Sequence, residues 1–192
     1  MRITGGRFGG RVLAAPADAR VRPTSDKVRQ AVFNILTHND FGLGFSLEGA
    51  RVVDLFAGTG AMGLEAVSRG AGFCLFIDDS AESRALLRQN VETLALTGST
   101  KIWRRDATML GAVTPGAGDP FDLAFLDPPY RRNLIAPALA SLRDGQWLAQ
   151  DALVVAECVR EESLNGLPGF SRLDSRNYGE TQIFFLRLIA QE

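Results

Sequence analysis

The sequence predicts an α/β fold in which a mostly parallel, seven-stranded sheet carries helices on both faces. Short apolar runs typical of buried strands alternate with helical patterns five times along residues 51–158. A glycine-rich turn, residues 57–63, follows the first of these runs and opens a helical pattern. Two more strand-like runs close the chain with no helical pattern between them, which predicts a C-terminal antiparallel pair.

The expected elements of the sheet can be placed by residue range. Apolar runs predict strands at 52–56, 73–77, 102–103, 121–126, 152–158, 170–176 and 182–189. Apolar residues at helical spacing predict helices at 64–70, 80–94 and 134–142. We therefore expect one main domain, residues 46–192, to hold the sheet and its helices.

A smaller extension, residues 1–45, precedes the sheet. Its paired glycines predict a short hairpin-like arm over residues 1–13, followed by a linker at 16–23. Thr24-Ser25-Asp26 offers N-caps for a helix that ends before Asn39, and residues 41–49 form a loop.

Composition narrows the class of protein. The chain has 192 residues, 46% of them hydrophobic, which suits a folded globular domain. No stretch is apolar enough to span a membrane and no signal core opens the chain, so we expect a cytoplasmic protein. Cys74 and Cys158 lie in apolar runs, and His38 is the only histidine. We therefore expect no disulfide, no metal site and no histidine-dependent nucleophile.

Charge is distributed unevenly along the chain. Residues 1–29 hold seven basic and two acidic side chains, a balance of +5, whereas the remaining residues carry −6. A basic arm on an acidic body suggests a polyanionic partner. The alternative is a solvated, flexible terminus. The candidate phosphate contacts are Arg2, Arg7, Arg11, Arg22, Lys27 and Arg29.

The segment Asp127-Pro128-Pro129-Tyr130 ends an apolar strand. Two prolines make this strand end stiff and remove two backbone donors, while its carbonyls and the Asp127 carboxylate remain as acceptors. Tyr130 adds an aromatic face. Such a rim suits a planar base with an exocyclic amine. The alternative is a proline-terminated strand with a surface aspartate.

The glycine pattern Gly58, Gly60 and Gly63 fits two kinds of cofactor, a dinucleotide or a methyl donor. Asp54 lies inside the preceding strand, where its charge would meet the ammonium of a methyl donor and repel a pyrophosphate. Asp78 is placed to hold a ribose diol of either cofactor, and Asp106 to meet an adenine edge. No Walker lysine follows the loop. The structural alternative is that the glycines only permit close packing of helix and sheet.

Together these residues resemble the class I S-adenosylmethionine-dependent methyltransferases, which have a Rossmann-like fold. The resemblance rests on Asp54-Leu-Phe-Ala-Gly-Thr-Gly60, Asp78, Asp106 and Asp127-Pro-Pro-Tyr130. It implies catalytic roles for Asp127, Pro128, Pro129 and Tyr130. It also implies S-adenosylmethionine contacts from Asp54, Phe56, Ala57, Gly58, Thr59, Gly60, Asp78, Asp79, Asp106 and Ala107.

Three further segments, residues 2–11, 22–29 and 178–181, look like the bacterial RsmD family. This resemblance implies methylation of N2 of a guanine in 16S rRNA, within an assembling small ribosomal subunit, by a monomer that needs no metal and no membrane. It adds Thr24 and Arg131 to the expected RNA contacts. The chain departs from the family pattern at Asp78-Asp79, where glutamate followed by another residue is usual, and at Phe8-Gly9, where bulkier or more basic residues are usual.

Two other functions remain open on the sequence. A DNA amino-methyltransferase shares the catalytic motif, although 192 residues leave little room for a target-recognition domain. A non-catalytic RNA-binding or ribosome-assembly factor would keep the basic arm and lose donor binding, which the intact glycine loop argues against.

Overall fold

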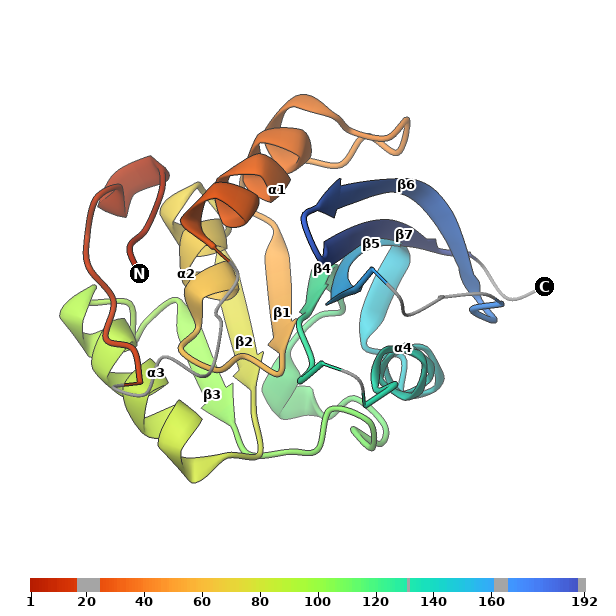
Figure 1. The fold of residues 1–192 in the computed structure, drawn as a ribbon. Coiled ribbons are helices and arrows are strands. Elements are labelled where there is room, and N and C mark those ends of the chain that lie inside the picture. The colour runs from red at the N-terminus through yellow and green to blue at the C-terminus, as the bar shows by residue number, and fades with distance from the viewer. Residues whose placement is uncertain (17–24, 131, 161–165, 190–192) are drawn as a thin grey trace.

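The computed structural model describes residues 1–16, 25–130, 132–160 and 166–189. Its centre is a seven-stranded sheet in the order β3-β2-β1-β4-β5-β7-β6 (Figure 1). Strands β1 to β5 are parallel, and β7 runs antiparallel to both of its neighbours. The predicted sheet is therefore confirmed. Its strands are β1 Arg51–Leu55, β2 Phe73–Ile77, β3 Thr100–Trp103, β4 Phe121–Leu126, β5 Leu148–Val159, β6 Phe170–Tyr178 and β7 Thr181–Leu188.

Four α-helices and two 3₁₀ turns complete the described chain. They are α1 Asp26–His38, α2 Ala61–Ser68, α3 Ala81–Thr93, α4 Ile135–Asp144, η1 Gly6–Phe8 and η2 Pro115–Ala117. Side chains of α1, α2 and α3 share one core on one face of the sheet, and α4 packs into the core of the other face. In the described ranges, no helix has the length and apolar character needed to cross a membrane.

Two boundaries differ from the sequence prediction. Strand β5 starts at Leu148, earlier than expected, because it passes through an irregularity at Asp151, whose φ is 60°. Gln150 and Asp151 are polar, so this part of the strand is not in an apolar run and was not predicted from the sequence. The final hairpin is also tighter than expected, since β6 and β7 continue until only Gly179-Glu180 joins them. Gly179 has a φ of 64°, which suits a two-residue hairpin turn.

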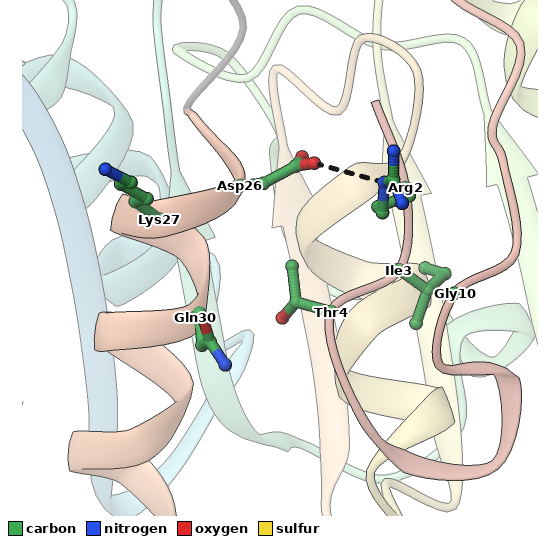
Figure 2. Close-up of a pocket in the computed structure, with 7 residues that line it drawn as sticks. All are labelled: Arg2, Ile3, Thr4, Gly10, Asp26, Lys27 and Gln30. Carbon is green, nitrogen blue, oxygen red and sulfur yellow. Dashed lines mark ion pairs between the residues drawn. The ribbon is translucent and has the colours of Figure 1, made fainter.

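The arm and α1 lie side by side, with a shallow groove between them (Figure 2). The predicted hairpin is present: Arg2 pairs with Val12, and the Ile3 N–H donates to the Arg11 carbonyl at 2.9 Å. Ile3 and Leu13 turn inward and are buried. The arm therefore has its own apolar attachment to the protein.

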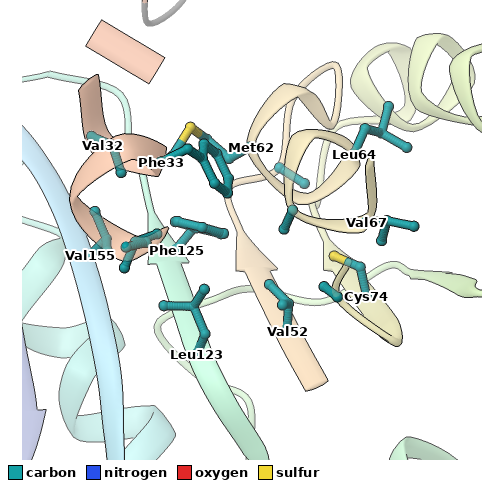
Figure 3. Packing of buried hydrophobic residues seen from close by; sticks show 14 of the residues in the cluster. Val32, Phe33, Val52, Met62, Leu64, Val67, Cys74, Leu123, Phe125 and Val155 are labelled. Atoms are coloured by element: carbon teal, nitrogen blue, oxygen red, sulfur yellow. The ribbon is translucent and has the colours of Figure 1, made fainter. Parts of the chain in front are cut away.

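Helix α1 is part of the main core. Val32 and Phe33 point toward β4 and β5, and the Phe33 ring lies 5.6 Å from the Phe125 ring, centroid to centroid (Figure 3). The division expected at residue 45 falls in the connection between α1 and β1. Packing is continuous across it, because arm and α1 side chains join the cluster formed by α2, α3 and the sheet.

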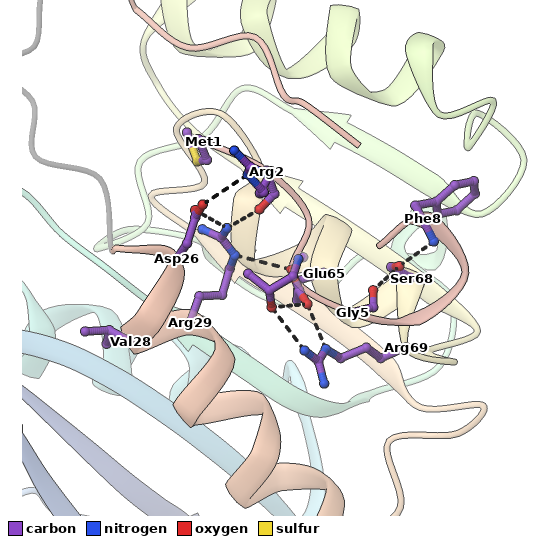
Figure 4. Close-up of polar contacts among 12 residues, drawn as sticks. Met1, Arg2, Gly5, Phe8, Asp26, Val28, Arg29, Glu65, Ser68 and Arg69 are labelled. Atoms are coloured by element: carbon purple, nitrogen blue, oxygen red, sulfur yellow. Dashed lines mark hydrogen bonds and ion pairs between the residues drawn. The ribbon is translucent and has the colours of Figure 1, made fainter. Parts of the chain in front are cut away.

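Glu65 of α2 holds the arm, α1 and α2 together through polar contacts (Figure 4). Its carboxylate accepts from the Thr4 N–H and the Thr4 hydroxyl, each at 2.7 Å. It also pairs with Arg29 at 3.3 Å and Arg69 at 2.7 Å. Arg29 and Glu65 are both fully buried, so each charge depends on its partners for the hydrogen bonds that water would otherwise supply.

We predict that Glu65→Ala lowers the free energy of unfolding by about 3 kcal/mol, because the buried Arg29 guanidinium loses a carboxylate partner. The remaining pair between Arg29 and Asp26, at 2.7 Å, keeps the loss near that value. Urea unfolding measures the change. Asp174→Asn, which breaks a more exposed pair with Arg176, is the control and should cost no more than about 1 kcal/mol. Equal losses in the two variants would contradict the role of Glu65.

Candidate functional site

The candidate site lies at the carboxyl edge of the sheet, where four parallel strands end in register. Leu55 of β1 pairs with Ile77 of β2 and Leu126 of β4, and Ile77 pairs with Trp103 of β3. The residues that follow this row come from distant parts of the chain and emerge along one line. Helix α2 after β1 and helix α4 after β4 cover opposite faces, so β1 and β4 flank the switch point where open α/β sheets bind ligands.

The loop after β1 depends on backbone conformations that side chains disfavour. Gly58 and Gly60 have φ values of 55° and 80°, and Phe56 has a φ of 58°. A Cβ on Gly60 would lie 2.2 Å from Leu87, and one on Gly63 would lie 2.4 Å from the Phe76 ring. Close packing therefore explains Gly60 and Gly63.

Gly58 has a different reason to be glycine. A Cβ there would meet nothing nearer than the Phe56 carbonyl oxygen, at 3.9 Å. Its φ favours glycine, and the space beside it is open. The loop thus offers a backbone that a ligand can approach closely.

Asp54 supports this loop from below. Its side chain is only 2% exposed, and its carboxyl accepts from the Gly63 N–H at 2.9 Å. Burial raises the pKa of Asp54 to about 8, so the carboxyl is largely protonated at neutral pH. The electrostatic argument against a pyrophosphate, which assumed an ionised Asp54, therefore loses its force.

Asp78, the residue after β2, binds the same loop from the side. One carboxylate oxygen accepts from the Gly58 N–H at 2.8 Å, and the other accepts from the Ser80 N–H at 2.8 Å. The neighbouring Asp79 is exposed. Gly58 lies twenty residues before Asp78 in the chain, and this contact fixes the glycine loop against the end of β2.

Asp106 and Ala107 follow β3. Asp106 is exposed, and its carboxylate accepts from the hydroxyl and the N–H of Thr108 at 2.7 Å and 2.8 Å. These bonds lower the pKa of Asp106, so its charge is retained at neutral pH. Ala107 is buried beside it.

The segment after β4 leaves the sheet next to the glycine loop. Asp127 is partly buried, Pro128 is buried, and Pro129 is exposed. The Tyr130 side chain is 40% exposed, and its hydroxyl donates to the Glu157 carboxylate at 2.8 Å. Burial is the main cause that raises the pKa of Tyr130, which keeps the hydroxyl protonated and able to donate.

Glu157 is a site residue that the sequence analysis missed. It lies near the end of β5 and is buried. The available signal was an acidic residue inside the apolar run 152–158, a placement that usually requires a polar partner. Only the fold shows that this partner includes Tyr130, because β4 and β5 are neighbours in the sheet.

The basic residues of the extension divide into two groups. Arg7, Arg11 and Lys27 are exposed, and Arg2 is exposed while lying 3.9 Å from the Asp26 carboxylate. Arg2 and Lys27 line the groove of about 300 Å³ between arm and α1, together with Gln30 (Figure 2). This groove lies within the expected RNA surface.

Arg29 lies elsewhere. It is fully buried, donates to the Arg2 carbonyl, and pairs with Glu65 and Asp26. A guanidinium in this position faces protein carboxylates and not a phosphate in solvent, so we remove Arg29 from the expected RNA contacts. Arg22, Thr24 and Arg131 lie outside the described residues.

Metal-ligating side chains do not gather anywhere in the described part of the chain. No group of three or more histidine, cysteine, aspartate or glutamate residues there could hold an ion. Cys74 and Cys158 are both buried. Burial raises the pKa of Cys74 well above its ordinary value, so this thiol stays protonated.

Comparison with known proteins gives the same picture over nearly the whole chain. The family model described as Conserved hypothetical protein 95 matches residues 1–187. Ribosomal RNA small subunit methyltransferase D of Escherichia coli K12 is 38% identical over 169 residues, which covers 88% of this chain and 78% of that protein. The protein of the same name from Haemophilus influenzae is 29% identical and covers 85% of this chain and 81% of its own.

Solved structures share the fold. A methyltransferase structure from Escherichia coli matches with a TM-score of 0.82 at 32% identity, covering 100% of this chain and 99% of that chain. A methyltransferase solved in complex with SAH has a TM-score of 0.59 at 19% identity, over 83% of this chain and 49% of that chain. The chain belongs to the family of Conserved hypothetical protein 95, the RsmD family of ribosomal RNA methyltransferases, as its motifs predicted.

Proposed function

We propose that this protein transfers a methyl group from S-adenosylmethionine to the exocyclic N2 of a guanine in 16S rRNA of the small ribosomal subunit. One observation carries the proposal. Leu126 and Leu55 are in register on adjacent parallel strands, so the acceptor-rich segment 127–130 begins beside the glycine loop. A donor on that loop and an amine at that segment would therefore be neighbours.

The donor site is assigned to the loop and the carboxylates around it. Phe56, Ala57, Gly58, Thr59 and Gly60 would provide the backbone surface. Each Asp78 carboxylate oxygen accepts one hydrogen bond from the backbone, which leaves lone pairs for ribose hydroxyls. Asp106 would meet the adenine edge, with Asp79 and Ala107 beside the nucleoside. Asp54 would support the donor loop indirectly, through its hydrogen bond with the Gly63 N–H. When bound, S-adenosylmethionine supplies the methyl group on an already activated sulfonium.

The chain's contribution to the chemistry comes from the end of β4. The N2 lone pair of guanine is delocalised into the ring, and positive charge grows on nitrogen as that lone pair forms the new bond. The Asp127 carboxylate and the Pro128 carbonyl would stabilise this charge, and one proton then leaves the nitrogen for solvent. Tyr130 would stack on the guanine after the base leaves its neighbours. Glu157 would hold the Tyr130 ring in place through the hydroxyl.

The RNA surface is assigned to the arm and the start of α1. Arg2, Arg7, Arg11, Arg22 and Lys27 would contact phosphates, and Thr24 and Arg131 join them through the family resemblance. We propose that the substrate is rRNA in an assembling small subunit, and that the protein binds it as a monomer in the cytoplasm.

The test is to incubate the protein with labelled donor and either small-subunit particles or duplex DNA, and to map the modified nucleotide. N2-methylguanosine in 16S rRNA is expected; methylated DNA or no product would refute the proposal.

We predict that Asp78→Ala weakens S-adenosylmethionine binding by about 1–3 kcal/mol, because a charged hydrogen bond to the ribose and the support of Gly58 are lost together. Calorimetry measures the donor affinity. Ser80→Ala is the matched control, since it removes the hydroxyl that caps α3 at 3.2 Å and leaves both carboxylates at this strand end. An Asp78→Ala protein with the affinity of the control would exclude Asp78 from the donor site.

We predict that Asp127→Asn keeps the fold and donor affinity but slows methyl transfer by about 10²–10³-fold, the usual scale for one preorganised electrostatic partner. The amide matches the carboxylate in shape and carries no charge to oppose the growing charge on nitrogen. Single-turnover transfer to saturating small subunits measures the step, with the product nucleoside identified by mass spectrometry. Full activity of this variant would refute charge stabilisation by Asp127.

Tyr130 variants provide the companion controls for that measurement. Tyr130→Phe keeps the stacking face and loses only the hydroxyl bond to Glu157, so its rate should fall only slightly. Tyr130→Ala removes the face and should be severely slow. Equal rates in these two variants would show that stacking contributes nothing.

We predict that Arg7→Gln with Arg11→Gln lowers RNA affinity and reduces the slope of log affinity against log salt by about 1.5, as expected for two lost phosphate contacts. Donor affinity should not change. The control is Arg172→Gln with Arg176→Gln on β6, which removes the same charge at the opposite edge of the sheet from β3. If both doubles alter the slope equally, net charge and not the arm determines binding.

A further inference from the structure

Asn90 connects the arm to the glycine loop. This α3 residue is 1% exposed, and its amide makes three hydrogen bonds. The oxygen accepts from the Ala14 N–H at 2.7 Å, and the nitrogen donates to the Ala14 carbonyl at 3.1 Å. The same nitrogen donates to the Thr59 carbonyl at 2.9 Å. One buried side chain therefore binds the end of the arm and the middle of the proposed donor loop.

Thr59 meets the open end of the arm hairpin at a second point. The Thr59 hydroxyl lies 3.7 Å from the Met1 sulfur, in donor geometry. Met1 and Leu13 are joined across the hairpin, since the Leu13 N–H donates to the Met1 carbonyl at 3.1 Å. The open end of the arm hairpin thus reaches Thr59 directly through Met1, and indirectly through the bonds of Ala14 to Asn90. Other polar anchors of the arm lie on α2, where the Thr4 N–H donates to Glu65 and the Phe8 N–H donates to Ser68.

The simplest role of a buried asparagine is structural, because its amide satisfies backbone groups that would otherwise lack hydrogen bonds. Asn90, however, joins two segments that are assigned to different ligands: the loop is assigned to the methyl donor and the arm to RNA. A donor bound to residues 56–60 would hold the Thr59 carbonyl in place, and RNA bound to the arm would hold Ala14. The ligand that binds first therefore restricts the motion of both the loop and the end of the arm. The second ligand then loses less conformational entropy when it binds.

We propose that Asn90 is a positioning residue that couples the two sites, so that methyl donor and RNA each strengthen the binding of the other. This inference rests on the proposed function, since it takes the loop as the donor site and the arm as the RNA site. Coupling of this kind is reciprocal, so it can be measured from either ligand.

The experiment measures the affinity of a 16S rRNA transcript with and without saturating S-adenosylhomocysteine, the non-reactive product. In the parent protein the product should tighten RNA binding about tenfold. In Asn90→Ala the ratio should fall to within about twofold of one. The matched control is Ser68→Ala, which removes the hydroxyl bonds to Phe8 and Gly5 but touches no residue of the loop. It should weaken RNA binding in both conditions and keep the parent's ratio.

Each outcome bears on the inference separately from the function. A parent protein that binds both ligands with a ratio of one would overturn the coupling and leave the methyltransferase assignment standing. An Asn90→Ala protein with the parent's ratio would also overturn it. A parent that binds no S-adenosylhomocysteine would refute the proposed function itself, and the coupling with it.

Hydrogen exchange on the parent protein tests the same idea if Asn90→Ala does not fold. The Ala14 amide is bonded to Asn90, so adding S-adenosylhomocysteine alone should slow its exchange together with that of Gly60. The Phe8 amide, bonded to Ser68, should not change. Unaltered exchange at Ala14 when Gly60 becomes protected would overturn the coupling.

Discussion

The in-register ending of four parallel strands is the constraint on which the rest of the protein depends. Parallel strands place all their carboxyl ends at one edge, and here Trp103, Ile77, Leu55 and Leu126 form one continuous row across that edge. Everything assigned to the donor or to the acceptor amine begins within a few residues of this row. A one-residue slip of β4 would turn Asp127 to the other face of the sheet.

Two carboxyl groups shape the loop beyond that row, and they bind its two ends. Asp54 is buried and largely protonated, and it binds Gly63 at the start of α2. Asp78 lies at the strand end and binds Gly58. The loop is thus held at both ends by side chains, while Phe56 and Gly58 have positive φ values and the space beside Gly58 is open.

The extension is built into the main core. Its polar attachment converges on Glu65, one turn into the helix that follows the donor loop, and its apolar attachment joins the cluster around Phe33 and Phe125. An arm fixed in this way is held at a set distance from the carboxyl edge of the sheet. Arg29, one of the seven basic residues among residues 1–29, is buried in this attachment and has no access to solvent.

The sequence by itself determined the sheet class, the order of its elements, the family and the motifs at each strand end. Those features follow from local periodicity, proline and glycine chemistry, and short residue patterns. Tertiary structure alone decided which polar groups meet: Glu157 with Tyr130, Asn90 with Thr59, and Arg29 with Glu65. These partners lie 27 to 36 residues apart, and their pairing depends on strand order and helix docking, which no local pattern encodes.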